Sequence, residues 1–203
     1  HATLVAGVSI ILKPRTVRWR MMGVDEEDDK GMGNDDLVGK VQAQAPPTKS
    51  SPIGEIFYGY LMLCANSFQP AMGYLYRALA LQQSDPLLCL LCGVASLGRS
   101  TNRQVDNRNH TIMQGMALFT HYAELRGDIP EVDYNFARAY HHLNLVHLAV
   151  PRYERVLQRA SSNAPKATFN MAREAAFNLA MIFTQSGSPD LARHLYRTWL
   201  AVE

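Results

Sequence analysis

The sequence predicts an all-α fold, a right-handed solenoid of about four helix pairs, preceded by a flexible acidic segment. After Pro52, alanines, leucines and aromatic residues recur at three- and four-residue spacing, and strand-like alternation is absent. The same stretch repeats one pattern of small and large residues, which is typical of stacked helical units. These two observations together favour an array of helix pairs over a bundle or a mixed fold.

The composition fits one folded core or a short array of repeats. Of 203 residues, 47% are hydrophobic and 19% are charged, which is too apolar for a disordered chain. The net charge of +2 gives no general attraction to nucleic acid or to an anionic membrane. The three cysteines cannot form a closed disulfide framework, which favours a reducing compartment, cytosol or nucleus. No run reaches the roughly 18 consecutive apolar residues that a membrane span needs.

The first fifty residues differ in composition and in apolar periodicity from the rest. Residues 2–13 are apolar enough to form a helix that Pro14 ends, so we interpret residues 1–22 as an upstream helix or the remnant of a preceding repeat. Acidic residues, glycines and prolines then crowd into residues 23–51, where apolar periodicity is almost absent. This composition predicts a flexible acidic linker, with the helical array following over residues 52–203.

Two strong copies of a repeat stand out in the second half of the chain. Each starts from a small residue, Ala137 or Ala180, followed by an aromatic residue three positions later, an alanine twelve positions later and a tyrosine sixteen positions later. Two fainter copies precede them, with Gly59 and Gly93 at the equivalent position. These four small residues are separated by 34, 44 and 43 residues, as expected for a 34-residue unit with insertions of ten and nine residues.

A helix-turn-helix unit of this length and pattern is the tetratricopeptide repeat. The pattern has a physical cause, because small residues let the two helices approach closely while large residues fill the space around them. Asn144 and Gly187 stand where the first helix of a unit ends, and both residue types tolerate a left-handed backbone turn.

The stretch from about residue 52 to the end also resembles a known family. Two adjacent repeats are followed by a helix-like segment over residues 115–127, then by residues 134–143 with the sequence YNFARAYHHL and residues 173–179 with the sequence REAAFNL. This arrangement resembles the C-terminal repeat array of the tetratricopeptide subunit of general transcription factor IIIC, which serves RNA polymerase III. The resemblance covers about 150 of the 203 residues and is absent in the acidic stretch.

The resemblance implies a non-catalytic scaffold in the nucleus. Its implied partners are the other subunits of transcription factor IIIC, with the initiation factor that recruits RNA polymerase III as a further partner. DNA would be contacted only indirectly, through the complex, and neither a membrane nor a cofactor is implied. The alternative within the same fold is a tetratricopeptide scaffold of a different multisubunit complex, such as a ubiquitin ligase or a trafficking complex.

The candidate site is a concave groove lined by one face of the first helix of each unit. Its first half is apolar and suits either a partner's apolar helix or the chain's own upstream helices. Its second half is polar and aromatic, with two asparagines placed to bond the backbone of an extended peptide. The candidate partner-binding residues, expected to be exposed in the groove, are Ile56, Tyr60, Leu91, Tyr134, Asn135, Arg138, His141, His142, Phe177, Asn178 and Met181.

The sequence gives less support to a metal site or a catalytic site than to a scaffold. Cys89 and Cys92 have the spacing of metal ligands, but no second pair exists, so a position in a helical core or in the groove wall is favoured. His141 and His142 point about 100° apart on a helix, which is unsuited to a shared metal. Neither a phosphate-binding glycine loop nor a catalytic triad is evident. Direct DNA binding is also disfavoured, because the arginines of the array are scattered along it.

A peptide clamp of the chaperone type is excluded as well. That clamp holds a C-terminal carboxylate with Lys, Asn and Arg side chains on the first helices of three units. The matching positions here are Ile56, Tyr60, Leu91, Glu131 and Asn135.

The end of the array raises a separate question. A terminal repeat of a soluble solenoid needs a polar outer face. The last helix instead ends with Trp199 and Leu200. Either these side chains pack inward or a partner covers this edge.

Overall fold

A computed structural model describes residues 51–102, 105–161 and 170–201 of the chain. These residues form eight α-helices and a short π-helical turn, with no β-strand among them, which confirms the all-α prediction. The upstream helix expected within residues 1–22 and all but the last residue of the expected acidic linker lie outside the described residues. The helices are α3 (Pro52–Cys64), α4 (Phe68–Leu81), α5 (Pro86–Arg99), α6 (Arg108–Arg126), α7 (Pro130–His142), α8 (Val146–Ser161), α9 (Ala172–Gln185) and α10 (Pro189–Leu195), followed by the turn η1 (Tyr196–Leu200).

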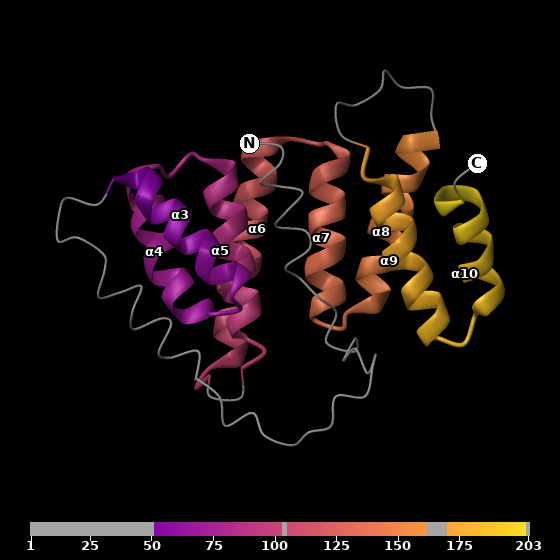
Figure 1. The fold of residues 1–203 in the computed structure, drawn as a ribbon, viewed down its shortest axis with the longest axis horizontal. Helices are drawn as coiled ribbons and strands as arrows, with labels where there is room; N and C mark the ends of the chain where they lie inside the picture. The colour runs from indigo at the N-terminus through magenta and orange to yellow at the C-terminus, as the bar shows by residue number, and fades with distance from the viewer. Residues whose placement is uncertain (1–50, 103–104, 162–169, 202–203) are drawn as a thin grey trace.

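The helices pack consecutively, in pairs that stand side by side along one row (Figure 1). The pairs are α3 with α4, α5 with α6, α7 with α8, and α9 with α10. Successive pairs are joined mainly by packing of α4 against α5 and of α8 against α9. The backbone of α7 comes close to α5 and α6 at only a few positions. This order of packing is that of a helical-repeat solenoid, with its narrowest junction between the second and third pairs.

Prolines mark the start of four of the described helices. Pro52, Pro86 and Pro130 begin the first helices of the first three units, and Pro189 begins α10. The pyrrolidine ring fixes a helical φ and lacks an N–H group that the first turn would leave unpaired. The sequence therefore encodes the start of each of these helices locally.

Left-handed residues make the turns between paired helices. Asn66, Asn144 and Gly187 have φ values of 56°, 62° and 79°, in the first, third and fourth units. Asparagine and glycine tolerate this conformation better than other residues do. The left-handed turn expected at Asn144 and Gly187 is confirmed.

Small residues allow the paired helices to approach closely. A Cβ atom placed on Gly59 would lie 2.6 Å from Cγ of Leu75, and one on Gly93 would lie 2.8 Å from Cδ2 of Phe119. Leu75 and Phe119 belong to the second helix of the same pair, so each glycine marks the crossing point of its two helices. Ala137 and Ala180, the equivalent residues of the later units, are both fully buried.

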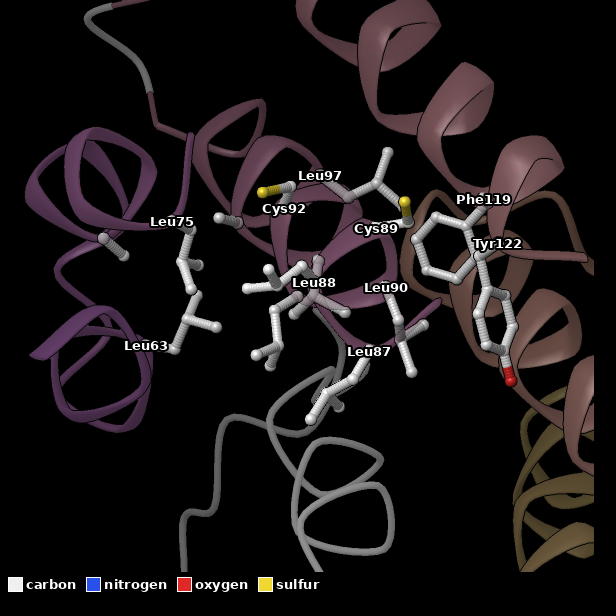
Figure 2. Packing of buried hydrophobic residues seen from close by; sticks show 14 of the residues in the cluster. Leu63, Leu75, Leu87, Leu88, Cys89, Leu90, Cys92, Leu97, Phe119 and Tyr122 are labelled. Atoms are coloured by element: carbon white, nitrogen blue, oxygen red, sulfur yellow. The ribbon is translucent and has the colours of Figure 1, made fainter. Parts of the chain in front are cut away.

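The hydrophobic core divides into two clusters that meet at α7. In the first cluster α5 is buried over residues 87–98, around nearly its whole circumference. Figure 2 shows its side chains between Leu63 and Leu75 on one side and Phe119 and Tyr122 on the other. Cys89 and Cys92 belong to this cluster, so they lie in the core, one of the two positions predicted for them.

The C-terminal end of the array packs partly inward. Trp199 lies half-buried against the second cluster, and Leu200 is also half-buried. Tyr196 remains 38% exposed and Leu191 remains 53% exposed. The last turn therefore covers part of its apolar surface and leaves the rest open.

Candidate functional site: the polar junctions and the groove

A buried polar network joins the second and third units, beside the apolar contact between Phe119 and Phe136. The hydroxyl of Tyr122 in α6 donates to Oε1 of Glu131 in α7 at 2.7 Å, and Nδ2 of Asn135 donates to the same hydroxyl oxygen at 2.9 Å. Nη2 of Arg126 donates to Oε2 of Glu131 at 2.9 Å. Burial and then the hydrogen bond to Glu131 raise the pKa of Tyr122 well above its ordinary value. The phenol therefore stays protonated and can keep donating to the carboxylate.

A second polar network joins the third and fourth units. Oδ1 of Asn178 in α9 accepts a hydrogen bond from Nη1 of Arg138 at 3.2 Å, and Nδ2 of Asn178 donates to the hydroxyl of Tyr134 at 3.1 Å. All three side chains are at most 8% exposed. The amide of Asn178 is thus used within the chain to connect α7 with α9.

His141 lies in the same region, buried against α8. Its ring packs edge-on against Tyr153, with 6.2 Å between ring centroids, and Nδ1 lies 3.5 Å from the Tyr153 hydroxyl. Burial, followed by the nearby charges of Arg138 and His142, lowers the pKa of His141 to about 4. The buried imidazole is therefore neutral at physiological pH.

An ion-pair cluster links α7 to α8. Asp133 is 1% exposed, and it accepts hydrogen bonds from Nη1 of Arg152 at 2.7 Å and from Nε of Arg155 at 2.8 Å. Arg159 continues the row with a 2.7 Å hydrogen bond to the carboxylate of Asp128. These three arginines share two carboxylates of their own chain, so most of the positive charge of this face is balanced within it.

Clefts open beside two of the junctions between units. One of about 830 Å³ lies at the turn between α4 and α5, where Tyr122, Arg126 and Glu131 form part of its wall. A smaller one of about 450 Å³ lies between α8, α9 and α10, with Phe183 and Leu191 among its lining residues. The larger cleft therefore adjoins the polar junction of the second and third units.

The groove residues predicted from the sequence divide by exposure. Phe177 is 46% exposed and is the most open of them. Four are half-buried: Ile56, Tyr60, His142 and Met181. The expected exposure is wrong for the remaining six, which are buried: Leu91, Tyr134, Asn135, Arg138, His141 and Asn178.

The burial of these six residues has two causes. Leu91 is on α5, which is buried between its neighbours over most of its length. Four of the polar residues bond one another or α6 and so connect successive units, whereas His141 packs against Tyr153 of α8 within its own unit. The pattern of a single sequence gives the face of a helix but not what covers that face, so it does not determine exposure.

Sequence reasoning missed several residues that hold the junctions. Tyr122 and Asp133 were not singled out, although both lie at the centre of polar networks. The row of Arg152, Arg155 and Arg159 was a usable signal, because spacings of three, four and seven residues place all three on one helix face. A buried acid on the neighbouring helix is the natural partner for such a row.

Metal-binding groups and membrane-spanning helices are both absent from the described residues. Within them, no group of three His, Cys, Asp or Glu side chains is placed to bind a metal ion. The helices of the same part are too short or too polar to cross a lipid bilayer. Burial, with a smaller effect of Cys89, raises the pKa of the Cys92 thiol to about 12, so this cysteine is protonated and a poor nucleophile.

Comparisons with known proteins identify the family. No protein-family model matches the chain. It is 34% identical over 182 residues to transcription factor tau subunit sfc4 of Schizosaccharomyces pombe, a match that covers 82% of the chain and 18% of that protein. It is 31% identical to the transcription factor tau 131 kDa subunit of Saccharomyces cerevisiae, over 77% of the chain and 15% of that protein.

A human protein extends the same relationship. General transcription factor 3C polypeptide 3 of Homo sapiens is 27% identical over 72% of the chain and 17% of its own length. The chain thus spans less than a fifth of the length of each of these relatives. All three are named as subunits of the same kind of transcription factor, and the chain belongs to this family of transcription factor IIIC subunits.

Proposed function

We propose that the chain is a right-handed tetratricopeptide array that serves as a non-catalytic scaffold of the transcription factor IIIC complex, in the nucleus. It binds fellow subunits during RNA polymerase III transcription initiation, and the initiation factor that recruits the polymerase is a further partner. The observation that carries the proposal is the 34% identity to a transcription factor tau subunit over 82% of the chain. The repeat spacing and the consecutive helix pairs support the tetratricopeptide assignment.

The state of the reactive side chains supports a scaffold rather than an enzyme. His141 is buried and held neutral, and Cys92 is buried with a pKa raised to about 12. Catalysis needs such groups to be accessible and near their working protonation state. Neither residue meets that requirement, and the polar networks in which the other candidates lie connect helices.

The accessible members of the predicted groove are the contacts that we assign to a partner. Phe177 is the central one, since an aromatic side chain that is 46% exposed offers a large apolar area. The half-buried members add their exposed atoms to this contact surface: Ile56, Tyr60, His142 and Met181. The six buried members act indirectly, because they fix the spacing between the first helices of successive units.

Contact with DNA is assigned to other parts of the complex. Arg77 pairs with Glu55, and Arg126 pairs with Glu131. Three arginines of α8 pair with Asp133 and Asp128. These five arginines have carboxylate partners within the chain, which makes them less available to neutralise phosphates.

The test is affinity purification of the tagged chain from nuclei of its own organism, with the bound proteins identified by mass spectrometry. Recovery of transcription factor IIIC subunits in stoichiometric amounts is the expected result. Recovery of ubiquitin-ligase or trafficking subunits in their place would contradict the proposal and favour a scaffold of another complex.

A matched pair of variants assigns the contact to the groove. Phe177→Ala is expected to reduce the recovered subunits about tenfold, as the loss of an exposed aromatic anchor does at many interfaces. Leu148→Ala removes a side chain of similar exposure, 40%, from α8 and should leave recovery unchanged. Equal recovery with both variants would remove Phe177 from the binding surface. Circular dichroism of each variant confirms that the helices remain folded.

A further inference from the structure

The first helix of the described array carries an uncovered apolar stripe. Ile53, Phe57 and Leu61 are 78%, 57% and 40% exposed. Their four-residue spacing places them on one face of α3. No other described helix has three large apolar side chains this exposed in a single row.

The equivalent positions of the later units are covered. The four small residues at the helix crossings align the units, so Phe57 corresponds to Leu91, Asn135 and Asn178. These three are at most 8% exposed. Leu61 corresponds to Ala95, Ala139 and Ile182, which are at most 3% exposed. Ile53 corresponds to the buried Leu87 and Glu131 and to the exposed Glu174.

Hydrogen bonds show what covers this face in the later units. Asn135 bonds the hydroxyl of Tyr122, which belongs to the preceding unit. Asn178 likewise bonds the hydroxyl of Tyr134 in the unit before it. The stripe of α3 is therefore the face that packs against a preceding unit, and for α3 the described residues contain no such unit.

The sequence offers one segment with the chemistry to fill this place. As a helix, residues 2–13 would gather Leu4, Val5, Val8, Ile11 and Leu12 within an arc of about 120°, while Ile10 lies outside this arc with the small and polar residues. Pro14 ends such a helix. Twelve residues span about 18 Å, close to the length of the 13-residue α3.

The stretch of chain between residues 2–13 and α3 is long enough to let the segment reach the stripe. Thirty-eight residues, 14–51, separate the segment from the start of α3. A flexible chain of that length has a root-mean-square span of about 31–37 Å. It can therefore pass along α3 in either direction, and it holds the segment at an effective concentration on the order of millimolar.

We propose that residues 2–13 form a helix that packs on Ile53, Phe57 and Leu61, in the place of the second helix of a preceding unit. The segment covers the first end of the array, and among its large apolar residues only Ile10 lies outside the contact face. Val5, Val8 and Ile11 are β-branched and weak helix formers on their own, so the helix forms together with the docking.

Hydrogen–deuterium exchange of the full 203-residue chain tests the proposal, with peptides from residues 2–13 and from α3 followed by mass spectrometry. In the unsubstituted chain, the amides of residues 2–13 are expected to exchange at least about tenfold more slowly than those of an unstructured peptide. Phe57→Asp and Val8→Asp should each remove this protection, although they lie on opposite sides of the contact.

Met113→Asp is the matched control, because Met113 is 71% exposed on α6, away from the stripe. It should leave the protection of residues 2–13 intact, and unchanged circular dichroism shows that each variant folds. Rapid exchange of residues 2–13 in the unsubstituted chain would overturn the proposal. Protection that grows with protein concentration, with a dimer in sedimentation, would also overturn it, because the stripe would then bind a second copy.

Discussion

At the scale of single residues, two glycines of α4 and α5 differ sharply in what surrounds them. A Cβ atom at Gly93 would lie 2.8 Å from the fully buried ring of Phe119, whereas one at Gly73 would meet only the flexible end of Arg77, at 3.8 Å. Gly93→Ala is therefore expected to lower the free energy of unfolding by about 1–3 kcal/mol. Gly73→Ala should raise it by about 0.5–1 kcal/mol, because alanine favours the helix. Urea denaturation followed by circular dichroism measures both, and stabilisation by Gly93→Ala would show that the helix crossing is not tight there.

His141 gives the fold a dependence on pH. Its pKa is about 4 in the folded chain and 6.5 for the unperturbed side chain, so the unfolded state takes up a proton first as the pH falls. The contribution of the neutral ring is therefore fully present above pH 6.5 and is lost between pH 6.5 and 4, by about 3 kcal/mol in all. His141→Gln should flatten the fall of the free energy of unfolding over this range. Urea titrations at several pH values compare the two slopes, and equal slopes would assign the pH dependence to other groups.

At the scale of elements, the junction between α6 and α7 depends on polar contacts more than the other junctions do. Glu131→Ala would leave the buried hydroxyl of Tyr122 without its acceptor and Arg126 without its carboxylate. The expected loss in the free energy of unfolding is about 1–3 kcal/mol. Glu124→Ala is the control, since Glu124 is 69% exposed and pairs only with His121 among the described contacts, and it should change stability little. A comparable effect of both variants would mean that the network adds no stability of its own.

The same elements show how far the sequence carries a prediction. The helix pairs, their turns at Asn144 and Gly187 and the crossing at Gly93 follow from local spacing and residue type, so they were predictable. The candidate groove residues lie on helices that do form, but the predicted exposure is wrong for six of them. Whether Asn178 bonds a partner or Tyr134 depends on the distance between α7 and α9, which is fixed by packing over 44 residues of chain. Periodicity within one helix contains no information about that distance.

At the scale of the whole molecule, two hydrophobic clusters share one helix. The first extends from α3 to α7 and the second from α7 to the last turn, and each is made of contacts between neighbouring units. In such an array stability is close to a sum of unit and junction terms, so one end is able to open without the other. The backbone of α7 comes close to α5 and α6 at only a few positions, so we expect the array to open most easily between the second and third units.

Opening of the second cluster alone is the expected consequence of Tyr153→Ala. Tyr153 is fully buried and packs on Tyr134 and His141, so its truncation removes about 3–5 kcal/mol from that cluster. Native-state hydrogen–deuterium exchange should show faster exchange in α8, α9 and α10, while α4 and α5 keep their protection. Leu75→Ala, a fully buried residue of the first cluster, should give the reverse pattern. If either variant accelerated exchange evenly from α3 to α10, the array would unfold as one cooperative unit and the junction at α7 would be as strong as the contacts within each cluster.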